Sequence, residues 1–172
     1  RVTDSLLTAL SGLPHVHSVS TFASKPGIIK TDSAFHGVIF KGTDYWDYFE
    51  ANLVQGRKPE SANEVLLSEE LAYMLSLDID DAILCYFIED DLRVRKLYIV
   101  GLYNTCMTEM DKLFVLGEIE VVRRLNNWDV DQVSGIEVIV DDLRHLEETT
   151  DAVYFATANR LDKEGNAFYT QN

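Results

Sequence analysis

Residues 64–87, EVLLSEELAYMLSLDIDDAILCYF, carry the signals of a strand, a helix, a turn and a second strand in one stretch. The apolar segment 64–67 predicts a short strand. Ser68 and the two glutamates after it predict a helix start, because a serine hydroxyl accepts hydrogen bonds from the free amides of a first turn. The expected inward stripe of this helix is Leu71, Met74 and Leu75. The acids at 78–81 then turn the chain into a strand at 82–88, so the stretch predicts a domain that mixes strands and helices.

The three carboxylates at 78–81 could bind a cation, act as an acid and base pair, or shape the backbone. A calcium loop requires ligands at alternate positions, a central glycine and a terminal glutamate, and this segment lacks that pattern. Asp80 is expected in the left-handed conformation between helix and strand, where glycine is best and Asn or Asp is tolerated. We therefore interpret the acids as a turn.

The rest of the chain also mixes strands and helices, without the regular alternation of a doubly wound sheet. Strands are predicted at 16–22, 28–29, 35–40, 93–102, 113–116 and 135–140, with a break at Pro26-Gly27 and a hairpin over 82–102 that turns at 89–91. Helices are predicted after a cap at Thr3 or Asp4, over 44–53 with Asp44 as cap, over 118–125 with a stop at Asn126-Asn127, and after a cap at Asp141-Asp142. The expected fold class is α+β.

Charge and composition exclude several classes of function. The 172 residues carry a net charge of −14, from 29 acids and 15 bases, which argues against nucleic acid as a partner and disfavours adhesion to anionic lipid. A hydrophobic content of 47% is enough to build a core for one domain or two small lobes. The chain has no apolar run of 18 residues and no signal peptide, and it opens at Arg1 rather than Met, so we expect a segment of a longer protein.

The two cysteines are expected to be free, buried thiols. In a hairpin that turns near Asp91, Cys85 lies opposite about Tyr98, and Cys106 lies well beyond that point. A disulfide would then need a Cα separation that the register does not offer.

Sequence motifs for catalysis or cofactor binding are absent. The chain contains no GxSxG, no GxxxxGK[ST], no GxGxxG and no CxxC. His15 and His17 would share one side of a strand, but two further ligands for zinc are not evident, so we expect no metal site and no cofactor. Carboxylate pairs assembled in space remain open, because sequence spacing cannot detect them.

Five segments occur in an order that is typical of a known family: GVIFKGTD at 37–44, QGRKP at 55–59, EVLLSEELAYMLSLDIDDAI at 64–83, YIVGLYNTCMTEMDKLFVL at 98–116 and GIEVIVDDL at 135–143. With these segments the chain resembles the extracytoplasmic domain of MacB/FtsX-type ABC transporter permeases, most closely the lipoprotein-releasing permeases of the LolC/LolE kind. It departs from the family pattern at Asp80 and Cys106, where glycine is common, and at Met110, where an aromatic residue precedes Asp-Lys.

The resemblance implies a non-catalytic domain between two transmembrane helices, on the periplasmic side of a bacterial inner-membrane permease. It also implies a MacB-like periplasmic core: a porter-like part at 1–55 plus 132–158, a small inserted αβ lobe at 56–131, and a tail or linker to a transmembrane helix at 159–172. Such a domain would relay motion driven by an ABC ATPase subunit and would work with a second permease copy. Lipoprotein cargo and a soluble carrier are the further partners that the resemblance suggests.

Lipoprotein cargo would need an apolar groove for its acyl chains. Candidates for that contact are the aromatic residues near the porter-like strands, Phe35, Phe40, Tyr45 and Trp46, although core packing explains them as well. Two alternatives remain beside the permease domain: a stand-alone acidic hydrolase with spatially assembled carboxylates, and a secreted ligand-binding module. Long apolar helices on both sides of the chain in the full gene would distinguish the permease from both.

Overall fold

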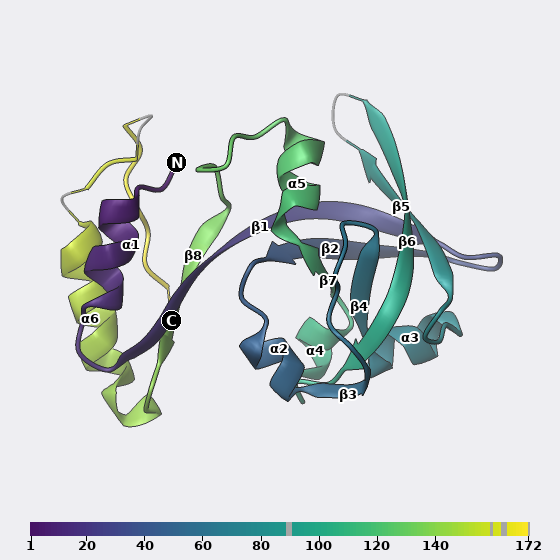
Figure 1. The fold of residues 1–172 in the computed structure, drawn as a ribbon, viewed down its shortest axis with the longest axis horizontal. Helices are drawn as coiled ribbons and strands as arrows, with labels where there is room; N and C mark the ends of the chain where they lie inside the picture. The colour runs from purple at the N-terminus through teal and green to yellow at the C-terminus, as the bar shows by residue number, and fades with distance from the viewer. Residues whose placement is uncertain (89–90, 159, 163–164, 172) are drawn as a thin grey trace. The chain divides into compact units, whose positions relative to one another are not determined.

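A computed structural model describes residues 1–88, 91–158, 160–162 and 165–171 (Figure 1). The chain forms two compact units: unit 1 contains Arg1–Thr21 and Trp128–Asn172, and unit 2 contains Phe22–Asn127. These boundaries differ from those of the expected porter-like part and inserted lobe, and that functional division stays a prediction. Glu89 and Asp90 of the predicted second acidic turn, and Asn159 at the start of the predicted tail, lie outside the described residues.

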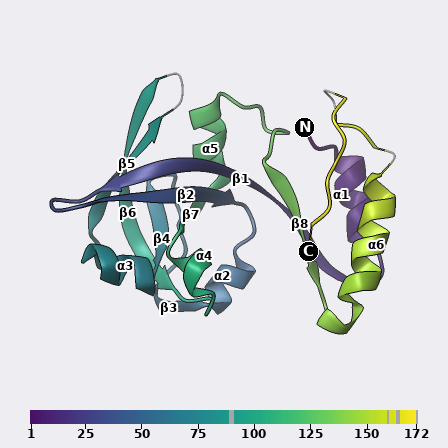
Figure 2. The ribbon, with the colours of Figure 1, turned by 180° about the vertical axis from the view of Figure 1, so that it is seen from behind.

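Unit 2 is built on a ring of paired strands (Figure 2). In order around the ring, the strands are β1 (Val16–Lys30), β2 (Phe35–Thr43), β7 (Phe114–Glu118), β4 (Glu64–Ser68), β6 (Leu92–Tyr103) and β5 (Ala82–Ile88). β5 pairs again with β1, so the sheet closes on itself, and β3 (Leu53–Gly56) adds to the side of β6. Closure satisfies the edges that an open sheet would leave unpaired. The predicted α+β class is confirmed.

The core of unit 2 follows from alternation along its strands. In β5, Cys85 and Phe87 are buried while their neighbours are more exposed, as expected for a strand with one face toward a core. The Phe87 ring meets the ring of Phe40 edge to face, with centroids 6.0 Å apart. A Cβ atom at Gly117 would lie 2.4 Å from Cζ of Phe40, so any larger residue in β7 here would require the ring to shift.

The sequence stretch 64–87 folds largely as predicted. The Ser68 hydroxyl accepts a hydrogen bond from the Leu71 amide (3.0 Å) and caps α3 (Glu69–Leu75). Asp80 has a φ of 72°, which confirms its predicted left-handed conformation. Met74 does not belong to the inward stripe, because it is exposed and the buried positions of the helix are Leu71, Ala72 and Leu75.

Two of the other predicted segments have different bounds. β1 continues through Pro26-Gly27, where a break was predicted, because both residues pair with β2: Pro26 lies opposite Ile39 and Gly27 opposite Val38. The predicted helix 44–53 is shorter at both ends, since β2 extends to Thr43, α2 covers only Asp47–Ala51, and β3 begins at Leu53.

The hairpin 82–102 is confirmed as β5 and β6, but its register differs from the expected one. Cys85 lies opposite Arg95 instead of Tyr98, because the strands pair from Ile88 and Leu92 outward. Both cysteines are free, as predicted, yet Cys106 is exposed rather than buried: it follows β6 in a left-handed turn with φ 62°.

The remaining helices of unit 2 are short. α4 (Thr108–Asp111) is a single turn in the connection between β6 and β7. α5 (Ile119–Asn126) ends at Asn127, whose φ of 54° is the left-handed conformation typical of a helix end, so the predicted stop is confirmed.

Unit 1 combines two helices with the pairing of β8 (Gly135–Val140) to β1. α1 (Asp4–Ser11) is capped by the Thr3 hydroxyl and lies beside α6 (Leu146–Thr157), as Figures 1 and 2 show. Asp142 caps the short 3-10 helix η1 (Leu143–His145), which leads into α6. Within the described part of the chain, no helix has both the length and the apolar character to cross a membrane.

Candidate functional site

The four residues predicted to contact cargo do not lie together on one surface. Phe35, at the start of β2, is 73% exposed, whereas Phe40 is fully buried against Phe87 in the core of unit 2. Trp46 is buried in a core cluster, and Tyr45 beside it is half-buried. The cargo contact stays a prediction, and Phe35 is the member with an accessible ring.

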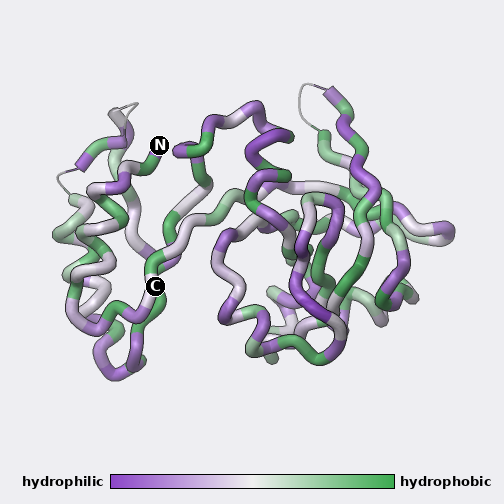
Figure 3. The backbone as a smooth tube through the Cα atoms, viewed as in Figure 1, coloured by the Kyte–Doolittle hydropathy of each residue, from purple (hydrophilic) through white to green (hydrophobic). Residues whose placement is uncertain are grey.

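Hydrophobic and hydrophilic residues are mixed along the β5–β6 hairpin (Figure 3). Its exposed face, which we call the hairpin face, carries further apolar side chains. Its members are Leu84, Ile88, Leu92, Val94 and Tyr98. They share one side because directly paired residues of antiparallel strands point the same way. Leu84 pairs with Lys30, and Lys30 pairs with Phe35, so the hairpin face continues to the Phe35 ring. Lys30 and Lys96 both pair with Leu84 and lie on the same side, so the exposed apolar side chains of this face are interspersed with two cations.

The acids at 78–81 act on the backbone. The Asp81 carboxylate accepts a hydrogen bond from the Asp78 amide (2.8 Å), and the Asp80 amide donates to the Ile99 carbonyl (2.8 Å). These contacts close the turn between α3 and β5, which confirms its interpretation as a turn.

The two thiols of unit 2 differ in reactivity. Burial raises the pKa of the Cys85 thiol to about 12, so this group stays protonated and inert at neutral pH. Cys106 is exposed and therefore accessible to reagents.

Arg57 and Glu64 form a bidentate ion pair in unit 2. The guanidinium donates two hydrogen bonds to the carboxylate, at 2.9 and 2.7 Å, and the Glu60 amide donates a third at 2.7 Å. The hydrogen bonds from Arg57 are the main cause that lowers the pKa of Glu64 to about 2. The pair ties the loop before β4 to the first residue of that strand, which is a structural role.

Unit 1 contains a cavity of about 450 Å³ that is lined mainly by β8, α6 and the segment 167–171. Val138 and Val153 contribute apolar walls, and Phe168 contributes a ring. The buried Thr149 hydroxyl also lines it and has no hydrogen-bond partner among the described residues. The volume is in the range of small-molecule sites, about 300–1,000 Å³.

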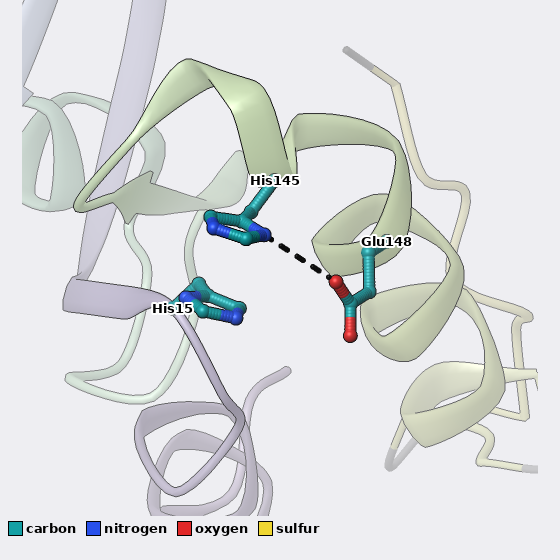
Figure 4. A group of neighbouring side chains, drawn as sticks. All are labelled: His15, His145 and Glu148. Carbon is teal, nitrogen blue, oxygen red and sulfur yellow. Dashed lines mark ion pairs between the residues drawn. The ribbon is translucent and has the colours of Figure 1, made fainter.

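A group of side chains whose types can ligate a metal lies elsewhere in unit 1 (Figure 4). The rings of His15 and His145 stack with centroids 3.7 Å apart, and Nδ1 of His145 lies 3.4 Å from the Glu148 carboxylate. Asp141 Oδ1 lies 3.6 Å from Nδ1 of His15. The sequence suggested His17 as the neighbour of His15, but His17 is not a member of this group. The spacing His145-x-x-Glu148, one helical turn, was the available signal for the true neighbours.

The sequence matches no protein-family model, and comparison with curated proteins gives no match. Solved structures that resemble the chain include two extracytoplasmic transporter domains. The extracellular domain of the noncanonic ABC-type transporter YknZ from Gram-positive bacteria superposes with a TM-score of 0.62 at 13% identity, covering 98% of this chain and 89% of that one. The periplasmic region of MacB from Actinobacillus actinomycetemcomitans superposes with a TM-score of 0.59 at 17% identity, covering 90% of this chain and 74% of that one. The chain therefore has the MacB-like fold of extracytoplasmic transporter domains.

Proposed function

We propose that this chain is the extracytoplasmic domain of an ABC transporter permease and relays ATP-driven motion without catalysing a reaction itself. The observation that carries the proposal is the likeness in fold to the YknZ domain, which extends over 98% of this chain and 89% of that domain. A fold can host unrelated functions, so the support comes from coverage of nearly a whole transporter domain rather than from a shared motif.

The division of the chain agrees with an insertion between two membrane helices. Both ends of the chain belong to unit 1, and unit 2 is inserted between them. The Val2 amide donates to the Asp131 carbonyl (2.9 Å), and the Arg1 guanidinium contacts Asp129 and Asp131, so the N-terminal segment is held by the second half of unit 1. Transmembrane helices before residue 1 and after the 159–172 linker would then both continue from unit 1.

Within this proposal, the porter-like part is 1–55 plus 132–158, and the inserted lobe is 56–131. The full-length permease would lie in the bacterial inner membrane, with this domain on the periplasmic side, and would pair with an ATPase subunit and a second permease copy. We further propose lipoprotein release as the process, with the exposed Phe35 ring and the hairpin face as the surface for lipoprotein cargo or a soluble carrier.

Cys106 provides the test of placement, because it is exposed while Cys85 is buried. In cells that make the full-length protein, a membrane-impermeant maleimide admitted to the periplasm is expected to label Cys106 without lysis of the inner membrane. The Cys106→Ser variant is the control for other cysteines. Labelling that requires lysis would contradict the extracytoplasmic placement.

Phe35 provides the test of cargo contact. A photo-crosslinking amino acid at Phe35 in the intact transporter is expected to capture acylated protein or its carrier, whereas the same probe at Tyr73, an equally accessible residue of α3, is not. Equal capture of acylated protein or carrier at both positions, or no capture at Phe35, would contradict a cargo surface here. Neither outcome would affect the placement of the domain, which the Cys106 labelling tests separately.

A further inference from the structure

We propose that His15, His145 and Glu148 form a binding site for a divalent transition-metal ion of the zinc type. The three side chains offer two imidazole nitrogens and one carboxylate oxygen, and their ligand atoms lie within 4.8 Å of one another (Figure 4). Two histidines and one glutamate are a ligand set that zinc uses in proteins, with a remaining position for water.

His15 belongs to this group although its backbone is in the left-handed conformation, which is unfavourable for most residues other than glycine. His15 has a φ of 60°, and its carbonyl accepts a hydrogen bond from the Asp141 amide (3.0 Å). A left-handed conformation costs a non-glycine residue about 1–2 kcal/mol. Glycine would make this turn at no such cost, so what histidine adds at this position is its imidazole ring.

The other two ligands come from one helical turn. His145 ends η1, and Glu148 lies three residues further on in α6, so both side chains lie on the same side of the helix start. Nδ1 of His145 and Oε2 of Glu148 are 3.4 Å apart. With metal–ligand bonds of about 2.0–2.1 Å, two ligands of one tetrahedral zinc ion are about 3.3 Å apart, so this pair already has the required separation.

His15 supplies the third ligand with support from Asp141. The Asp141 carboxylate faces Nδ1 of His15 at 3.6 Å, which is ion-pair rather than hydrogen-bond distance, and Nε2 on the other side of the ring is left for an ion. A carboxylate that holds the second nitrogen of a ligating histidine is a usual feature of metal sites. Nearby carboxylates also favour a cation at this position.

Binding requires one ring to turn. The two imidazole planes are parallel within 1°, and the nitrogen lone pairs lie in those planes, so they cannot meet at one ion in the stacked arrangement. The side chains are 33% and 38% exposed, which leaves space for a rotation about the side-chain torsions. The ion would then connect the turn before β1 to the start of α6 within unit 1.

Isothermal titration of the metal-free 172-residue chain with zinc chloride tests the site. We expect one ion per chain with a dissociation constant of about 10 μM or lower, and binding weaker by at least about tenfold in His15→Ala and in His145→Ala. His17→Ala and His36→Ala are the matched controls and should bind as the wild type does. The proposal would be overturned by a dissociation constant above about 10 μM in the wild type. It would also be overturned if His15→Ala and His145→Ala bind zinc as the wild type does, or if His17→Ala and His36→Ala weaken binding by the same factor.

A second variant separates loss of ligand from loss of fold. Glu148→Gln keeps the size of the side chain and removes its charge, at a position that is largely exposed. Zinc is expected to raise the unfolding temperature of the wild type, because a ligand that binds only the folded state stabilises it, and to raise that of Glu148→Gln much less. Equal stabilisation of the two proteins would overturn Glu148 as a ligand.

Discussion

Replacement of Ser68 by alanine removes two hydrogen bonds from a fully buried hydroxyl. The hydroxyl oxygen accepts from the Leu71 amide (3.0 Å), which caps α3. The hydroxyl O–H donates to the Asp111 carbonyl (2.5 Å), which lies 43 residues further along the chain. One small side chain therefore both starts a helix and joins β4 to α4. We expect Ser68→Ala to be one of the more costly single substitutions in unit 2.

The magnitude follows from the two bonds. Loss of a serine N-cap costs about 1 kcal/mol in free energy of unfolding. A carbonyl that loses its donor inside the protein costs about 1–3 kcal/mol more, and Asp111 is 5% exposed. The sum is about 3 kcal/mol, a large part of the total stability of about 5–15 kcal/mol of an ordinary domain.

Urea unfolding measured by Trp46 fluorescence is the assay, because Trp46 is buried in the core of unit 2. Trp128 belongs to unit 1 and is replaced by phenylalanine in all proteins compared, so that the signal reports unit 2. Ser61→Ala, at an exposed serine of the same unit, is the control and should change the free energy by less than about 0.5 kcal/mol. A loss below about 1 kcal/mol for Ser68→Ala would refute the reasoning.

Three further predictions concern unit 2. Gly117→Ala should lower the free energy of unfolding by about 1–3 kcal/mol, since the new methyl group overlaps the Phe40 ring, and an unchanged urea midpoint would show that the ring can move aside. Glu64 has a folded-state pKa of about 2 against an ordinary value of 4.5. Its pairing with Arg57 therefore stabilises the fold fully above pH 4.5, and this stabilisation is lost as the pH falls toward 2. Acid-unfolding curves should show the loss in the wild type and not in Glu64→Gln, and parallel curves for the two proteins would contradict the prediction. Asp80→Gly should raise the stability by up to about 1 kcal/mol in thermal unfolding, because glycine adopts the left-handed conformation without strain, and a lower stability would mean that the aspartate contributes more than its backbone.

Local signals in the sequence predicted helix ends and turns well. Ser68 caps α3, Asp80 adopts a left-handed turn, and Asn127 ends α5, as expected. Each of these outcomes has a local signal, a capping side chain or a residue that tolerates the left-handed conformation, which a sequence shows directly.

Predictions that depended on which face of an element is covered were less successful. Met74 has helical spacing to the buried Leu71, yet it is exposed, because the helix turns Ala72 and Leu75 inward. Cys106 is apolar enough for a core but lies in an exposed turn. Pro26-Gly27 predicts a break in the strand, but β1 continues because both residues pair with β2.

The sequence by itself determined the α+β class, most elements and the turns between them, because propensities, caps and left-handed residues act over short distances along the chain. Only the tertiary structure decided that six strands close into a ring in the described part of unit 2, that Phe40 lies over Gly117, and that His15 meets His145 across 130 positions. Such contacts form when segments far apart in sequence pack to bury apolar surface, and no local pattern records which segments will meet.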